Sequence, residues 1–429
     1  MLLSYGMETA FFRFFTKQDT DREKVQSTTL TSLTASSIIF LITGLSFRTL
    51  LAEISQFQLD YVVYSLWILT LDALVVLPFV WFRANEQPLR YAVLKIINVF
   101  INLGLNLFFF LALPILAETE GIWSKLWNPD NKVAYVFISN LIASAATLLM
   151  VLPVYIKIGF GFSKSLWREM MKYALPVLVA GIAFSINEAF DRILLKYLLP
   201  EDIAEVEVGL YSACYKLGMF MTLFVMAFRL GIEPFFFNYS SAENAKNTYA
   251  AITKYFTSLG CIILMVVTVY IDFFKLLLIP NSRYWEALKI VPIILVANLF
   301  LGIYHNLSVW YKVTDRTKFG AYISIFAAII TLLANYILIP KIGYVGSAIA
   351  TLLAYGSMML LSYIYGQKYY AIPYELRAIG SVLTASILFS SLSFYVFRGN
   401  YWIGSGLLFV FLCGILYLER EQFKRIWNK

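Results

Sequence analysis

Long apolar runs alternate with short polar segments along the whole chain. Most runs reach the roughly 20 helical residues that cross a bilayer core of about 30 Å. Open strands cannot span lipid with unpaired edges, so the runs are predicted to be α-helices. The thirteen runs are approximately 2–15, 27–52, 61–82, 91–115, 133–157, 171–198, 208–237, 251–279, 287–311, 319–340, 345–367, 376–397 and 401–418. The first run is too short for a full crossing.

An internal repeat relates the two halves of the chain. V-W-F-R-A-N-E at 80–86 matches V-W-Y-K-V-T-D at 309–315 with an offset of 229, and Asn106 meets Asn335 at that offset. Y-G-M-E-T-A-F-F at 5–12 matches L-G-I-E-P-F-F-F at 230–237 with an offset of 225. Blocks in the same order at nearly the same spacing indicate a duplicated unit.

The repeat predicts the architecture. A unit of six helices is an even number, so the two copies have the same orientation and form a parallel repeat. The expected fold is an all-α polytopic membrane protein with two six-helix lobes and two C-terminal helices, about 13 transmembrane segments in all. The expected division is 1–158, 159–367 and 368–429. The first lobe is expected to lack its first helix and part of its second.

Composition and charge agree with a membrane protein. The chain is 60% hydrophobic and 14% charged, whereas soluble domains have about 25% charged residues. The net charge of +8 does not indicate nucleic-acid binding, because 21 of the 34 Lys and Arg lie in one set of alternate loops. The positive-inside rule places these loops and the C-terminus in the cytoplasm.

Metal and cofactor sites are not expected. The only histidine is His305. The three cysteines, Cys214, Cys261 and Cys413, lie in apolar runs without C-x-x-C spacing, which is typical of small buried hydrophobic residues.

Two neighbouring runs, 171–198 and 208–237, carry polar and charged residues that are costly in lipid. They are Asn187, Glu188, Asp191, Arg192, Lys216, Arg229 and Glu233. A charge at the bilayer centre costs about 2.5–3.5 kcal/mol on the insertion scale. These groups are therefore predicted to face one another, a water-filled cavity or the headgroup region. A charged cavity inside the bundle indicates transport.

Three motifs resemble the polysaccharide transporter family of the multidrug/oligosaccharidyl-lipid/polysaccharide (MOP) superfamily. They are D-R-I-L-L-K-Y-L-L from Asp191, V-G-L-Y-S-A-C-Y-K-L-G from Val208, and L-I-P-K-I-G-Y-V-G-S-A-I-A-T at 338–351. The resemblance implies a flippase for polyprenyl-diphosphate-linked oligosaccharide in surface polysaccharide and O-antigen lipopolysaccharide biosynthesis. It implies alternating access, with a lipid-linked oligosaccharide as substrate and with glycan polymerases and glycosyltransferases as candidate partners.

For such a substrate, cations within the cavity are the candidate binding groups, since Arg and Lys suit a diphosphate. The candidates are Arg13, Arg48, Lys95, Arg192, Lys216 and Arg229. Arg13, Arg48 and Arg229 equally suit helix ends, where they would extend toward the headgroups.

The candidate ion-coupling groups are Asp72, Glu188 and Asp191. Asp72 has no cation in its own run, so it is either a coupling group or the partner of a cation on another helix. Glu233 is one turn from Arg229, which favours a pair within one helix.

Two other functions remain open. A drug/cation antiporter of the same superfamily would have a more acidic cavity. A membrane-bound polysaccharide polymerase or ligase would need catalytic groups on a sizeable outer loop. The largest predicted outer loop, 116–132, contains no His or Arg, and no catalytic residue is expected.

Overall fold

The computed structural model describes residues 3–17, 20–55, 57–118, 121–240, 242–418 and 420. Every regular element in these residues is a helix, as the apolar runs predict. The contacts divide the chain into two compact units, unit 1 at Met1–Leu178 and unit 2 at Val179–Lys429. The predicted division into 1–158, 159–367 and 368–429 stays a prediction. Most of the basic tail at 419–429, on which the predicted cytoplasmic C-terminus partly rests, lies outside the described residues.

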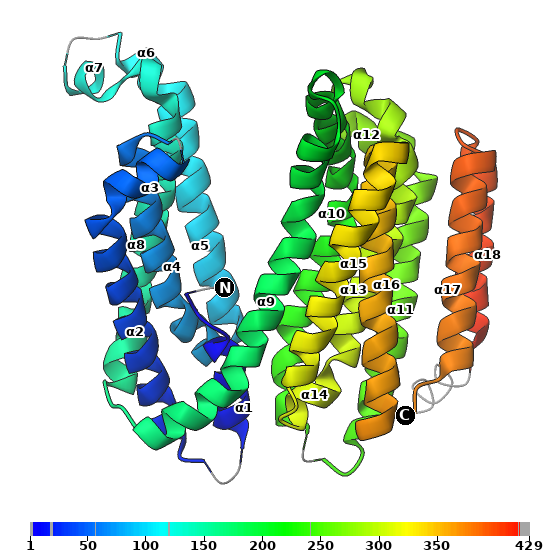
Figure 1. Ribbon diagram of the computed structural model, residues 1–429, viewed down its shortest axis with the longest axis horizontal. Helices are drawn as coiled ribbons and strands as arrows, with labels where there is room; N and C mark the ends of the chain where they lie inside the picture. Colours follow the sequence, from blue (N-terminus) through cyan, green and yellow to red (C-terminus); the bar gives the residue numbers. More distant parts are fainter. Residues whose placement is uncertain are drawn as a thin grey trace. The chain divides into compact units, whose positions relative to one another are not determined.

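Unit 1 is a bundle of long helices (Figure 1). Its helices are α1 (Met7–Thr16), α2 (Arg22–Ser46), α3 (Arg48–Ser55), α4 (Leu59–Ala84), α5 (Pro88–Leu107), α6 (Leu113–Leu116), α7 (Ile122–Leu126) and α8 (Lys132–Ile158), followed by the first half of α9 (Lys164–Leu198). A π-helical segment, Phe108–Ala112, joins α5 to α6, and a short 3₁₀ turn, Pro129–Asn131, precedes α8.

Unit 2 contains the second half of α9 and the helices that follow it. They are α10 (Glu201–Asn238), α11 (Ala245–Val269), α12 (Ile271–Leu278), α13 (Val291–Leu307), α14 (Val309–Val313), α15 (Lys318–Ile342), α16 (Tyr344–Tyr369), α17 (Leu376–Ser391) and α18 (Tyr401–Leu418). A 3₁₀ segment, Ser282–Ile290, precedes α13, and a π-helical segment, Leu392–Val396, follows α17.

Twelve helical spans in the described residues are long and apolar enough to cross a membrane. Each corresponds to one of the predicted runs after the first. The run at 2–15 forms α1, which has 10 residues and is not among the spans. The expectation that this run is too short to cross is confirmed.

The two units use the same helix pairings. In unit 1, α4 contacts α2 and α8, and α5 contacts α8. In unit 2, α13 contacts α11 and α16, and α15 contacts α16 in the same way. The predicted repeat therefore corresponds to a duplicated bundle.

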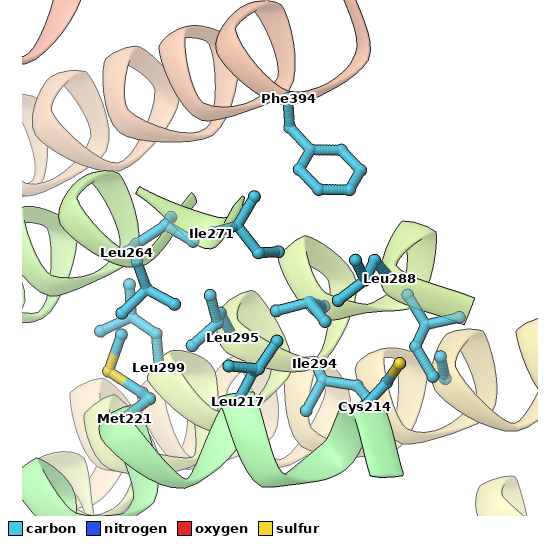
Figure 2. Packing of buried hydrophobic residues seen from close by; sticks show 14 of the residues in the cluster. Cys214, Leu217, Met221, Leu264, Ile271, Leu288, Ile294, Leu295, Leu299 and Phe394 are labelled. Atoms are coloured by element: carbon cyan, nitrogen blue, oxygen red, sulfur yellow. The ribbon is translucent and has the colours of Figure 1, made fainter. Parts of the chain in front are cut away.

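A continuous apolar core holds unit 2 together. Leu217 and Met221 of α10 face Ile294 and Leu299 of α13, as Figure 2 shows, and all four are fully buried. Leu217 and Met221 lie one helical turn apart and share a face of α10, whereas α13 is buried over most of its circumference. The same packing fixes the side of α10 that faces α9.

Candidate functional site

Asp191, in the second half of α9, is the most deeply buried carboxylate of the predicted set. Its exposed fraction is 3%. Its Oδ2 accepts hydrogen bonds from the Tyr211 hydroxyl of α10 at 2.8 Å and from the Thr351 hydroxyl of α16 at 2.7 Å. Its Oδ1 accepts one from the Asn335 amide of α15 at 3.0 Å. Three neutral donors from three other helices therefore converge on one carboxylate.

A second layer of hydrogen bonds orients two of these donors, Asn335 and Thr351. The Ser347 hydroxyl donates to Oδ1 of Asn335 at 2.8 Å, so the amide nitrogen of Asn335 faces Asp191. That nitrogen also donates to the Thr331 carbonyl at 2.8 Å. The Thr351 hydroxyl likewise has a second acceptor, the Ser347 carbonyl at 3.0 Å. Asn335 and Thr351 are thus positioned by hydrogen bonds additional to those with the carboxylate.

The start of α16 is fixed by a close approach to α10. Gly343 has a φ of 55°, in the left-handed region that glycine adopts without steric cost. A Cβ at this position would overlap the carboxylate of Glu207 on α10. That carboxylate accepts a hydrogen bond from the backbone N–H of Tyr344 at 2.8 Å, at the positive end of the helix dipole.

Glu188 lies one turn before Asp191 on α9 and is half-buried. It accepts hydrogen bonds from the hydroxyls of Tyr355 on α16 and, at 3.5 Å, Tyr215 on α10. The adjacent Asn187 accepts from Thr331 at 2.8 Å. Its amide nitrogen is buried and has no hydrogen-bond partner among the described residues. A buried donor without a partner is uncommon and indicates a place that a bound group can satisfy.

Arg192 is a predicted cation that contacts this cluster. Its guanidinium carbon lies 4.9 Å from the ring centre of Tyr215 and 6.0 Å from that of Tyr211. It also donates to the Glu188 carbonyl at 3.3 Å. Arg192 and Glu188 are therefore in contact beside Asp191, and their roles in transport stay a prediction.

The cluster can hold a proton or a small cation. A buried carboxylate with neutral donors is an acceptor for either. Tyr and Thr hydroxyls can both donate and accept, so the network can adapt to an ionised or a protonated Asp191. Among the described residues, no group of three or more His, Cys, Asp or Glu is arranged to hold a metal ion.

The other two predicted cations of unit 2 lie elsewhere on α10. Lys216 is exposed. Arg229 is half-buried and lines a small cavity with Glu233, His305 and Lys312. The expected pairing of Glu233 with Arg229 needs correction, because the ion pair that the structure shows is with Lys312, at 2.8 Å from another helix. This partner is 79 residues away, so helical spacing could not reveal it.

The same ion pair occurs in unit 1. Arg83 of α4 contacts Glu8 of α1. Glu8 and Glu233 occupy matching positions of the repeat, and so do Arg83 and Lys312. Conservation of the pair between the two copies supports the repeat independently of the helix pairings.

The remaining candidate cations, Arg13, Arg48 and Lys95, lie in unit 1 on α1, α3 and α5. Arg13 is half-buried in α1, and Arg48 is exposed at the first residue of α3. Lys95 is exposed, with its ammonium 4.7 Å from the ring centre of Phe79. Their convergence with the cations of unit 2 on one cavity stays a prediction.

Asp72 of α4 is exposed and accepts a hydrogen bond from the Ser144 hydroxyl of α8 at 2.7 Å. This partner is neutral. The structure thus gives Asp72 a neutral contact between α4 and α8, and its coupling role stays a prediction.

The partners of Asp191 were not predicted as site residues. A signal for them was present, because Tyr211 lies in V-G-L-Y, Thr351 ends G-S-A-I-A-T, and Asn335 occupies a repeat position. The segments that carried the family resemblance therefore meet at this carboxylate.

Comparisons with known proteins agree on one superfamily. A family model described as "Polysaccharide biosynthesis protein" matches residues 1–228, more than half of the chain, and one described as "MatE" matches residues 176–337. No curated protein matches the chain.

Solved structures match the fold over most of the chain. An outward-facing multidrug resistance MATE family transporter of the MOP superfamily is 11% identical with a TM-score of 0.67, covering 86% of this chain and 84% of that one. A MOP superfamily transporter from Pyrococcus furiosus, described by a binding pocket of reversed polarity, is 13% identical with a TM-score of 0.67, covering 86% and 83%. A mutant MATE transporter from Vibrio cholerae is 14% identical with a TM-score of 0.65, covering 88% and 85%.

Proposed function

Because the chain belongs to the polysaccharide biosynthesis protein family of MOP-superfamily transporters, we propose that it flips a polyprenyl-diphosphate-linked oligosaccharide across the inner membrane. The product would be delivered to the outer leaflet for surface polysaccharide biosynthesis, including O-antigen lipopolysaccharide. Glycan polymerases and glycosyltransferases would be its functional partners. The C-terminus would lie in the cytoplasm, where the basic loops gather.

The observation that carries the transport mechanism is the Asp191 cluster. The carboxylate joins α9 to α10, α15 and α16 through three hydrogen bonds. Protonation of Asp191 adds a hydroxyl donor where three donors already converge. At least one partner side chain must then rotate so that it accepts a hydrogen bond or no longer donates to that oxygen. Binding of a proton or sodium ion would therefore change the contacts among these four helices. Alternating access needs such a coupling of ion occupancy to helix packing.

The cargo would be held by cations. Arg192, Lys216 and Arg229 supply positive charge along α9 and α10, and Arg13, Arg48 and Lys95 supply it in unit 1. Guanidinium and ammonium groups would replace water around the diphosphate. The polyprenyl tail would remain in lipid, and no catalytic step is required.

Reconstitution in liposomes tests this proposal. The vesicles would contain a polyprenyl-diphosphate-linked oligosaccharide in the inner leaflet, and a glycosidase added outside would report its arrival. Lys216→Ala should abolish arrival without changing expression. Lys196→Ala, a matched control at another exposed lysine, should not. Wild-type protein that moves no lipid-linked oligosaccharide under any gradient would refute the proposal.

A drug/cation antiporter is the second candidate, favoured by the MatE match over residues 176–337. Uptake of a fluorescent organic cation into the same vesicles, driven by a proton or sodium gradient, separates the two functions. Cation uptake without oligosaccharide movement would establish the antiporter. The family match favours either transporter over a polysaccharide polymerase or ligase.

A further inference from the structure

The two copies of the repeat differ in their packing at one corner of the bundle, the place where the ends of three helices meet. In unit 1 the C-terminal ends of α4 and α8 and the N-terminal end of α5 enclose a groove of about 490 Å³. Trp81 and Phe82 of α4 are its buried aromatic residues, and Val93 and Leu94 of α5 form one apolar side. Met150, Pro153 and Val154 of α8 form the other side, and the lining also includes Leu89, Arg90 and Lys157.

The equivalent corner of unit 2 is filled by aromatic side chains. Trp310, which matches Trp81 in the repeat, has the Phe319 ring centre at 5.2 Å and the Tyr369 ring centre at 6.0 Å. Phe319 also contacts Tyr369 at 4.9 Å and Tyr365 at 5.4 Å. Rings at these separations pack as aromatic pairs and close the space between the helices.

Cations replace two of these aromatic residues in unit 1. Arg90 stands 229 residues before Phe319, the same offset that relates Trp81 to Trp310. Lys157 lies at the end of α8 with its ammonium 5.0 Å from the Trp81 ring centre, as Tyr369 at the end of α16 lies over Trp310. The difference thus converts a packed corner into an open groove bordered by two positive charges.

The two charges have no acidic partner in the described part of the chain. Arg90 donates to the side-chain oxygen of Gln87 at 3.0 Å, and the contact of Lys157 is with an aromatic face. Both side chains are exposed. Apolar residues surround them at the surface, including Ile156 with an exposed fraction of 84% and Leu89 with 79%. Such exposure is compatible with lipid contact and unfavourable in water.

We propose that this groove is a binding site for an anionic glycerophospholipid. Its phosphate would lie between Arg90 and Lys157, and one acyl chain would follow the apolar sides formed by α5 and α8. The groove has the size of typical small-ligand pockets, and a ligand that suits it must combine an anion with a long apolar group. Basic pockets between transmembrane helices on the cytoplasmic side bind anionic lipid headgroups by this combination. The cargo proposed above plays no part in this assignment.

Native mass spectrometry of the detergent-solubilised full chain tests it with phosphatidylglycerol as the probe and phosphatidylcholine as the neutral reference. Each cation near the surface contributes about a fivefold change in affinity, so Arg90→Ala with Lys157→Ala should weaken phosphatidylglycerol binding about 25-fold. The matched control is Lys318→Ala with Lys368→Ala, which removes two basic residues from the equivalent region of unit 2. The control should change binding less than twofold. Equal loss in both pairs, or equal loss for phosphatidylcholine, would overturn the proposal.

A second pair of substitutions guards against misfolding. Arg90→Phe with Lys157→Tyr gives unit 1 the aromatic residues of unit 2. This variant should keep or raise the melting temperature while it loses phosphatidylglycerol binding. A stable variant that binds phosphatidylglycerol as the wild type does would show that the groove is not the site.

Two further measurements locate and identify the ligand. Phosphatidylglycerol brominated in the acyl chain should quench part of the tryptophan fluorescence, and Trp81→Phe should remove that part, since bromine quenches only nearby indoles. Inorganic phosphate at millimolar concentration should not displace the lipid, and a polyprenyl diphosphate should bind this groove more weakly than phosphatidylglycerol. Displacement by phosphate, tighter polyprenyl binding, or unchanged quenching in the Trp81 variant would each contradict the assignment.

Discussion

The substitutions Asp191→Asn and Asp191→Ala are expected to distinguish the contribution of Asp191 to stability from its role in coupling transport to an ion gradient. Asp191→Asn keeps the shape of the side chain but places one amide donor among converging donors. The Tyr211 and Thr351 hydroxyls can still donate to the remaining oxygen, while the Asn335 amide loses its acceptor at 191. Asn335 retains the Thr331 carbonyl as a second acceptor, at 2.8 Å. The lost hydrogen bond is to a charged group and costs about 1.5–3 kcal/mol, so the variant should still fold.

Asp191→Ala removes the acceptor altogether. Thr351 keeps the Ser347 carbonyl and Asn335 keeps the Thr331 carbonyl, whereas the buried Tyr211 hydroxyl loses its acceptor. One orphaned buried donor costs about 1–3 kcal/mol. Loss of side-chain volume adds a cavity term. Thermal unfolding in detergent should therefore rank the melting temperatures as wild type, then Asn, then Ala.

Transport should respond differently from stability. Neither variant can carry the charge of a carboxylate, so both should lose the response of transport to a proton or sodium gradient. Tyr211→Phe is the control, because it removes one hydrogen bond to a charged group, worth about 1.5–3 kcal/mol, yet leaves the carboxylate. Tyr211→Phe should be at least as unstable as Asp191→Asn. It should nevertheless keep a measurable stimulation of the transport rate by the ion gradient. A folded Asp191→Asn protein with a wild-type gradient response would refute the coupling role.

Three other predictions concern structure. Gly343→Ala should lower the melting temperature, because a left-handed backbone costs an alanine about 1–2 kcal/mol. The new methyl group would also overlap the Glu207 carboxylate. An unchanged melting temperature would contradict this. Glu233→Gln should destabilise unit 2 by about 1–3 kcal/mol, because it removes the negative charge that Glu233 presents to Lys312 at 2.8 Å in a largely buried ion pair, and denaturant unfolding would measure the loss. Burial of Asp272 by itself raises the pKa of its carboxyl, but the hydrogen bond from Lys275 and nearby positive charge lower the net pKa below the usual value. The stabilisation that the ionised carboxylate provides is therefore complete above the unfolded-state pKa of about 3.9 and is lost as pH falls through the lower folded-state pKa. The wild type should accordingly melt at a higher temperature than Asp272→Asn at pH 7, and this difference should shrink in acid.

The sequence by itself determined the class and the repeat of this protein. Runs of about 20 apolar residues must form helices in lipid, because only helices satisfy their own backbone hydrogen bonds there. The same runs became the twelve spans that the structure describes. Three blocks at nearly the same offset predicted the duplication, and the matching ion pairs of Glu8 and Glu233 now support it. Glu188, Asp191 and Arg192 could also be selected from sequence, because charge in an apolar helix is costly without partners.

The tertiary structure alone decided which partners these charges have. The donors from Asn335 and Thr351 lie 144 and 160 residues away from Asp191 along the chain. Helical spacing describes neighbours within about four residues and carries no information on contacts of that range. It also could not distinguish the open corner beside Trp81 from the filled one beside Trp310, since both are apolar runs ending in an aromatic residue. In unit 2 aromatic side chains from three helices pack against one another, whereas in unit 1 the corresponding side chains leave a groove. Only packing in three dimensions determines which of the two arrangements forms.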